Sequence, residues 1–346
     1  MNYKIAIILN NFAPQDIPLL YGVLAYQLNF ILNLSKNFII DIYCTNTSQK
    51  TWEGINNISL INPNAPLDKN FFEAKDYNVV LDFLNNNYKS EKFITIALKH
   101  NYNDKQSTNP MDVDILFVSS EQLKNTYLKN TKIKEQNIKI LHPCLSSYKP
   151  FLPKQQNKSF SSFGIDFRHL KLFQKIQLLL AFIKLKKEKY LFSLKIIAPH
   201  HKKNIFLNLL SLIFLTKEVE FLNFQEKMDN FWDKLDYFIN LKQSPFNFNT
   251  IEAMNNSIPC ITTDLDGASS IISNNQSGWI IDTPLTTKKL FEALKTILDN
   301  NKNYQEIAKN ANQIASKLTI EEHSKKLFDI IEEKILSNNQ DCENNP

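Results

Sequence analysis

The chain has 346 residues, of which 43% are hydrophobic and 22% are charged, and its formal net charge is +5. This length exceeds one ordinary hydrophobic core and predicts two domains, and the composition excludes a disordered protein. The positive charge comes almost entirely from lysine, because Arg168 is the only arginine. No basic stripe interleaved with aromatic residues is present, so we expect no nucleic-acid partner.

The cysteines and the start of the chain predict the compartment. Cys44, Cys144, Cys260 and Cys342 are scattered, without a CxxC pair or the spacing of metal ligands, which favours a reducing environment and no metal site. The first residues are typical of a strand and not of a signal peptide, and the longest apolar run, residues 205–215, is too short to span a bilayer. We expect a cytoplasmic protein, and the cationic surface leaves open a peripheral association with the inner face of a membrane.

The first part of the chain alternates short apolar runs with polar or helical stretches. An apolar-rich segment covers residues 19–34. This rhythm is typical of βαβ units and predicts a parallel sheet with helices on its faces. The predicted strands are residues 4–9, 38–44, 77–83, 93–98, 114–118 and 138–141. A Pro-containing segment, residues 148–153, followed by the polar residues 154–159, indicates a linker, so the first domain is predicted to span residues 1–150.

The same rhythm begins again after the linker and predicts a second Rossmann-like domain over residues 151–318. Its predicted strands are residues 194–198, 219–222, 237–241 and 260–263, and its predicted helices are residues 171–184, 204–215, 250–255 and 287–299. A capping box formed by Thr319 and Glu322 predicts a last helix over residues 319–336, followed by a disordered polar tail over residues 337–346.

Only five glycines occur, so each is expected to have a backbone reason for its place. Gly164, Gly267 and Gly278 are predicted to lie at turns that follow or precede strands, at the edge of the sheet where ligands bind in open α/β folds. None of them belongs to a GxGxxG motif or a Walker loop, which argues against a dinucleotide or ATP phosphate loop.

The segment from residue 244 to residue 282 carries the most information. It contains Glu252-Ala253-Met254, then Ser257-Ile258-Pro259 before a strand, and then Gly267 and the Ser277-Gly278 turn. In this order and spacing the segment resembles the nucleotide-sugar half of the retaining GT-B glycosyltransferases of group 1. Residues 114–119 and 138–143 resemble the end of that family's first domain, and residues 194–198 and 219–223 resemble strands of its second domain.

The resemblance implies a fold, a reaction and partners. The fold would be α/β of the GT-B type, with two tandem Rossmann-like domains whose parallel sheets face each other across a cleft, and with the last helix returning toward the N-terminal, acceptor-binding domain. The enzyme would move a sugar from a nucleoside diphosphate sugar to a glycan or a lipid-linked acceptor, with retention of the anomeric configuration. Neither a metal nor a cofactor would take part.

The resemblance places a ribose-binding role on Glu252. A carboxylate can accept hydrogen bonds from two adjacent hydroxyl groups, and the beginning of a helix also attracts a diphosphate. An alternative interpretation is that Glu252 only completes a capping box with Asn249, which lies three residues earlier.

Arg168 and Lys171 are predicted to hold the diphosphate leaving group, because the family places an arginine and a lysine after a glycine that corresponds to Gly164. Without a metal, fixed cations must neutralise the charge that develops on the leaving group. The position directly after the glycine, where the family has a basic residue, is Ile165 in this chain. His100 follows a predicted strand of the first domain, where many relatives carry a catalytic or sugar-contacting group, and it is our remaining catalytic candidate.

The loop before Glu252 departs from the family. Eight residues before that glutamate the family has an acid that contacts the donor sugar, and this chain has Ser244. We nevertheless expect this loop to bind the substrate, and its candidates are Ser244, Phe246, Asn247 and Phe248, together with Gly164 across the site. The missing acid leaves two alternatives open: a catalytically silent GT-B protein that binds glycans or supports a partner enzyme, and a nucleotide-sugar epimerase.

Overall fold

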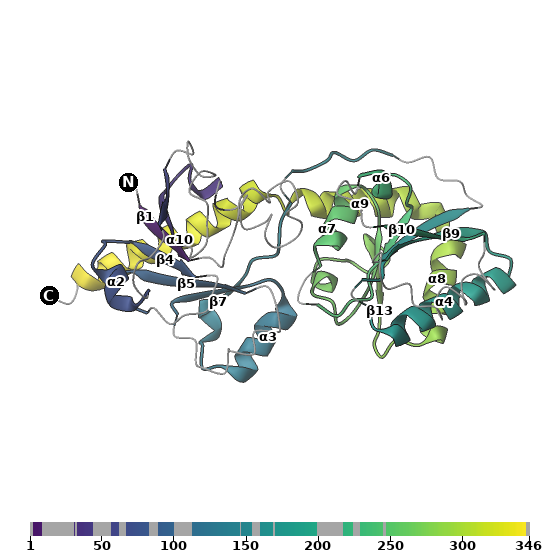
Figure 1. Cartoon of the computed structure of the whole chain (residues 1–346), viewed down its shortest axis with the longest axis horizontal. Helices are drawn as coiled ribbons and strands as arrows, with labels where there is room; N and C mark the ends of the chain where they lie inside the picture. Colours follow the sequence, from purple (N-terminus) through teal and green to yellow (C-terminus); the bar gives the residue numbers. More distant parts are fainter. Residues whose placement is uncertain are drawn as a thin grey trace. The chain divides into compact units, whose positions relative to one another are not determined.

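The chain folds into two compact units, one formed by Met1–Ser147 with Leu318–Pro346 and the other by Tyr148–Lys317. The computed structural model describes residues 3–8, 31, 33–43, 57–61, 67–82, 89–99, 113–145, 147–153, 160–168, 170–198, 217–223, 229–244 and 247–343. Each unit is built on a sheet in which every pair of neighbouring strands is parallel (Figure 1). The prediction of two α/β domains with parallel sheets is therefore confirmed.

The N-terminal unit contains a 7-stranded sheet in the order β3-β2-β1-β4-β5-β6-β7. Its strands are β1 (Lys4–Ile8), β2 (Ile39–Tyr43), β3 (Ile58–Ile61), β4 (Val79–Asp82), β5 (Ile94–Lys99), β6 (Ile115–Val118) and β7 (Ile138–Ile140). Its helices are α2 (Lys69–Glu73), α3 (Glu121–Asn130), the short η3 (Glu135–Asn137) and α10 (Ile320–Glu343). Strand β3 was not predicted, because it has only four residues and is not part of a longer apolar pattern.

Helix α10 belongs to the N-terminal unit although it ends the chain. Leu145 and Thr319 form a β-bridge, and the Phe38 and Phe328 rings lie 5.4 Å apart. The Thr319 hydroxyl accepts a hydrogen bond from the Glu322 N–H at 3.5 Å, as the capping-box pattern predicted. The helix continues to Glu343, so the prediction that it ends at residue 336 and gives way to a disordered tail is wrong for residues 337–343.

The C-terminal unit contains a 6-stranded sheet in the order β10-β9-β8-β11-β12-β13. Its strands are β8 (Ser161–Asp166), β9 (Phe192–Ala198), β10 (Val219–Asn223), β11 (Tyr237–Ile239), β12 (Cys260–Thr263) and β13 (Gly278–Ile281). Its helices are α4 (Leu172–Lys187), α6 (Asp229–Trp232), α7 (Phe248–Asn255), α8 (Thr287–Asp299) and α9 (Tyr304–Ser316), with the short η4 (Gly267–Ser270) and η5 (Asn301–Asn303). The predicted helix over residues 204–215 lies outside the described residues.

Aromatic packing forms the centre of the C-terminal unit. The Phe163 and Tyr237 rings from β8 and β11 stack at 5.1 Å, and Phe182 of α4 meets Phe163 edge-on at 5.4 Å. Tyr304 of α9 packs against Tyr237 from another side. Burial of these large side chains fixes the helices on the sheet, since each contributes some 2–3 kcal/mol through area removed from water.

None of the helices in the described part of the chain has a stretch long and apolar enough to cross a lipid bilayer.

Gly164 lies inside strand β8 and not at a turn after it, which corrects the sequence-based expectation. A Cβ atom at this position would lie 2.2 Å from Leu235 Cδ1 and 2.8 Å from Phe231 Cζ. The absence of a side chain thus lets the segment after α6 pack directly on the sheet. Gly164 is a packing residue here, and its backbone pairs with the neighbouring strands. Its contact with a substrate stays a prediction.

We predict that Gly164→Ala lowers the free energy of unfolding by about 1–3 kcal/mol, because the flexible ends of Leu235 and Phe231 must move aside. Gly278→Ala should cost more, because its Cβ would lie 2.5 Å from the Cys260 backbone oxygen, which cannot rotate away. Urea unfolding followed by tryptophan fluorescence measures both values. Equal or reversed costs would contradict this interpretation.

Candidate functional site

The order of the C-terminal sheet reverses between β8 and β11, and this switch point defines the candidate site. In parallel sheets a crevice forms outside the carboxyl ends of the strands where the order reverses. Asp166 is the last residue of β8, Asn240 directly follows β11, and Asp266 follows β12. These polar residues, far apart in the sequence, therefore lie at the same edge of the sheet.

Asn240 connects the segments that meet at this edge. Its amide donates to the Asp266 carboxylate and, at 3.1 Å, to the Thr250 hydroxyl in α7. Its carbonyl oxygen accepts from the Asn247 amide at 2.9 Å and from the Lys242 N–H at 3.2 Å. All four bonds begin at one side chain that is 4% exposed, so Asn240 fixes the loop after β11 and the beginning of α7 together.

Asp266 is a fully buried carboxylic acid behind this loop. Its Oδ1 accepts from the Ala268 N–H at 2.9 Å. Burial raises the pKa of Asp266 from 3.8 to about 7, although the hydrogen bonds from Ala268 and Asn240 and the charge of Lys242 oppose the rise. Its loop is also joined to the loop before α7, because the Gly267 N–H donates to the Ser244 carbonyl at 2.9 Å.

Asn247 caps helix α7. Its side chain accepts from the Asn249 N–H at 3.1 Å, and its backbone is extended, as an N-cap requires. Asn249 is therefore the second residue of the helix and not its cap, so the alternative in which Glu252 completes a capping box with Asn249 is wrong. Glu252 is half-buried and lies one turn into α7, on the same helix face as Asn249.

Arg168 forms a two-bond ion pair with Asp166 at the end of β8. The distances are 3.0 Å from Nε to Oδ1 and 2.7 Å from Nη2 to Oδ2. The amide of Asn249 lies 3.4 Å from the same carboxylate. The structure thus brings Arg168 and the beginning of α7 together through Asp166, and the guanidinium remains 25% exposed.

Two lysines lie at the beginning of α4, next to this ion pair. Lys171 is the N-cap residue, its side chain is exposed, and its N–H donates to Gln174 Oε1 at 3.0 Å. Lys175, half-buried, lies one turn further with its Nζ 5.6 Å from the centre of the Phe167 ring. Burial lowers the pKa of Lys175, and the charge of Asp166 opposes this change.

Ser244 is buried, and its Oγ has no hydrogen-bond partner among the described residues. It lies between β11 and α7, whose N-cap is Asn247 and whose first residue is Phe248. The predicted site residues Phe246 and His100 lie outside the described residues, so their roles stay predictions.

The sequence analysis missed Asp166, Lys175, Asn240 and Asp266. Asp166 and Asn240 could have been found by noting which polar residue directly follows each predicted strand, because these positions define the sheet edge. Asp266 precedes Gly267 in the loop that the family resemblance singled out. Lys175 carried no such signal, because it looks like one of many lysines on an amphipathic helix.

Within the described part of the chain, no group of three or more His, Cys, Asp or Glu side chains is arranged to hold a metal ion.

Residues 174–314 match the family model described as glycosyl transferases group 1. No curated protein matches the chain. The matched residues begin in α4, end in α9 and include α7 with Glu252 and the buried pair of Asn240 and Asp266.

Solved structures share the fold across nearly the whole chain. A glycosyltransferase from Rickettsia africae has a TM-score of 0.71 at 15% identity, with 97% of this chain and 99% of that chain covered. Anabaena Alr3699/HepE in complex with UDP has a TM-score of 0.70 at 12% identity, with 95% and 100% covered. The lipopolysaccharide outer core galactosyltransferase WaaB has a TM-score of 0.71 at 15% identity, with 96% and 99% covered.

We predict that the C-terminal unit loses stability as the pH rises from about 4 to about 7. The folded state binds the Asp266 proton more tightly than the unfolded state, so raising the pH through this window favours unfolding. The full shift corresponds to at most about 4 kcal/mol. Urea unfolding at several pH values should show a smaller decline for Asp266→Asn, which does not titrate. An unchanged decline in this variant would contradict the assignment.

Proposed function

We propose that this chain, a glycosyltransferase with the GT-B fold and a group 1 C-terminal unit, binds its nucleoside diphosphate sugar at the β8–β11 switch point. The observation that carries the proposal is the joining of the Asp166–Arg168 pair to the beginning of α7, by the 3.4 Å approach of Asn249 to Asp166. A cation and the start of a helix thereby lie side by side at the edge where ligands bind in such sheets.

The diphosphate is held by cations and helix starts. The N-terminus of α7 presents backbone N–H groups and the positive end of its dipole. Arg168 supplies a planar guanidinium that Asp166 keeps in one orientation, and Lys171 and Lys175 add positive charge at the beginning of α4. These groups stabilise the negative charge that appears on the nucleoside diphosphate as the sugar leaves, so no metal is required for that task.

Glu252 binds the ribose. It lies on the same face of α7 as Asn249, whose side chain approaches Asp166. This position is one turn beyond the helix start that receives the phosphates. This spacing of about 5 Å along the helix axis suits a ribose attached to a diphosphate. The alternative role of Glu252, in a capping box with Asn249, does not apply, because the N-cap of α7 is Asn247.

Ser244, in the segment between β11 and α7, contacts the sugar. Ser244 replaces the acid of related enzymes, and its buried hydroxyl can donate one hydrogen bond to a sugar oxygen or accept one from a sugar hydroxyl. Asn247 and Phe248 contact the sugar beside Ser244, and the predicted role of Phe246 rests on the sequence alone. The reaction retains the anomeric configuration, and the acceptor is a hydroxyl group of a glycan or of a lipid-linked acceptor. The name of one structural neighbour, the lipopolysaccharide outer core galactosyltransferase WaaB, supports a saccharide acceptor. UDP-sugars are the first donors to test, because UDP is bound in the HepE structure.

Nucleotide binding tests the site residue by residue. We expect Arg168→Gln and Glu252→Gln each to weaken UDP binding by about 10- to 100-fold, the cost of losing a hydrogen bond to a charged group. Matched substitutions of exposed residues on α9, Lys309→Gln and Glu306→Gln, should leave the affinity unchanged. Isothermal titration calorimetry measures the four variants. Equal affinities for all of them would place the nucleotide elsewhere.

Turnover tests the reaction itself. We expect transfer from a UDP-α-hexose to a saccharide acceptor to continue in the presence of EDTA and to give an α-linked product, because cations of the protein neutralise the leaving group. The anomeric proton coupling in NMR spectra reads the configuration. A β-linked product would contradict retention, release of an epimerised sugar nucleotide without acceptor would support an epimerase, and UDP binding without any turnover would support a catalytically silent protein.

A further inference from the structure

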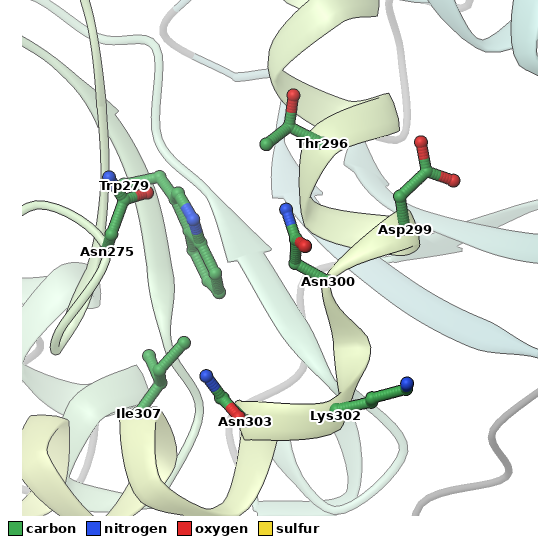
Figure 2. A pocket seen from close by; sticks show the side chains of 8 residues that line it. All are labelled: Asn275, Trp279, Thr296, Asp299, Asn300, Lys302, Asn303 and Ile307. Atoms are coloured by element: carbon green, nitrogen blue, oxygen red, sulfur yellow. The ribbon is translucent and has the colours of Figure 1, made fainter.

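We propose that a pocket at the amino ends of the strands of the C-terminal sheet, opposite the proposed donor site, is a second ligand site, which binds one pyranose unit of a glycan. The pocket has a volume of about 450 Å³, within the range of small-molecule sites. It lies between the beginning of β13, the last turn of α8, η5 and the beginning of α9 (Figure 2).

This pocket is separate from the proposed donor site. Helix α8 follows β13 closely and packs back along it, so the last turn of α8 returns to the amino end of the sheet. Asn275 and Trp279 mark this end, because one precedes β13 and the other is its second residue. Over its 13 residues α8 runs roughly 20 Å, which separates the pocket from the carboxyl edge that carries Asp166.

Trp279 supplies the apolar platform. Its indole meets the ring of Tyr237 edge-on at 5.7 Å and packs against the central core, which holds its orientation. Figure 2 shows the indole on one side of the pocket, opposite the side chain of Asn300, with Ile307 and Asn303 below. A rigid aromatic face and an aliphatic floor match the C–H face of a pyranose ring, which is apolar although its rim carries hydroxyl groups.

The other walls match that rim. Asn275, Asn300 and Asn303 each bring a carbonyl oxygen and an NH₂ group, so each can accept from one hydroxyl and donate to another. Asn303 precedes α9 without forming a side-chain cap bond. Amide groups around an aromatic ring therefore recognise a polyhydroxylated ring, not an apolar ligand.

The charge of the pocket favours a neutral ligand. Its lining contains one cation, Lys302, and one anion, Asp299, and the Asp299 carboxylate already accepts from Tyr190 at 2.6 Å. No concentration of positive charge is present among the lining residues, which distinguishes this pocket from the diphosphate site near Arg168. A nucleotide or a sugar phosphate would meet the Asp299 charge without enough compensation.

Binding at this pocket does not depend on catalysis, but its use rests on the proposed function. A glycan unit held here would keep a longer acceptor or product on the protein between transfers, because a second attachment raises the effective concentration of the reacting end. Disaccharides and longer chains are then expected to bind more tightly than single sugars.

Fluorine NMR on the full chain tests the proposal. The protein contains three tryptophans, so 5-fluorotryptophan gives three signals, and Trp279→Phe identifies the one of interest. We expect methyl glucoside, methyl galactoside or N-acetylglucosamine to shift the Trp279 signal saturably, with Kd values in the millimolar range, in the presence and absence of saturating UDP. Sorbitol, an open-chain polyol that presents no ring face, should leave the signal unchanged.

Substitutions at the rim complete the test. Asn300→Leu and Asn303→Leu, checked for native folding by circular dichroism, should weaken the sugar-induced shift at least tenfold. Gln313→Leu, which replaces an exposed amide on α9 outside the pocket, should not. No saturable shift with any pyranose, an equal shift with sorbitol, a shift abolished by UDP, or full binding in both asparagine variants would overturn the proposal. UDP binding without a sugar shift would overturn only this inference, whereas a sugar shift without UDP binding would overturn only the proposed donor site.

Discussion

The hydrogen bonds of the Asn240 side chain are the constraint on which the candidate site depends. They join the end of β11, the Asp266 loop after β12 and the beginning of α7. Polar groups at these strand and helix ends must be satisfied, and the Asn240 side chain bonds to groups of all three segments. The buried carboxyl group of Asp266 lowers the stability of the folded chain at neutral pH. This cost is consistent with a role of Asp266 in holding its loop in position.

Electrostatics at the sheet edge combine fixed and exposed charges. Asp166 neutralises part of the Arg168 charge while it holds the guanidinium in place, so in the proposed site Arg168 would meet a ligand in a prepared orientation and not as a mobile surface charge. The half-buried Lys175 adds a cation that the protein interior already partly desolvates. An incoming diphosphate would replace the water around these groups. Because the side chains are already oriented, binding would cost little further conformational entropy.

The architecture of a parallel sheet explains why the two ligand sites that we propose for the C-terminal unit differ in character. Strands and helices run in opposite directions, so helix N-termini gather at the carboxyl edge and helix C-termini at the amino edge. The first edge suits anions, as the α7 and α4 starts show. The second lacks that field, and around Trp279 it presents amides and an aromatic ring that suit a neutral saccharide.

The sequence by itself determined the two α/β units. Apolar runs such as residues 260–263 indicate buried strands, and the apolar stripe of α8 indicates a helix that packs on their sheet. It also led to the proposal of Arg168 and Glu252 as site residues, because motifs are local. Tertiary structure decided what depends on distant segments: that Asn240 meets Asp266, that Gly164 packs under Leu235 inside a strand, and that Trp279 lines one pocket with Asn300 and Asn303. Strand order in a sheet is set by long-range pairing, so the neighbours of a strand end cannot be read from the residues beside it in the sequence.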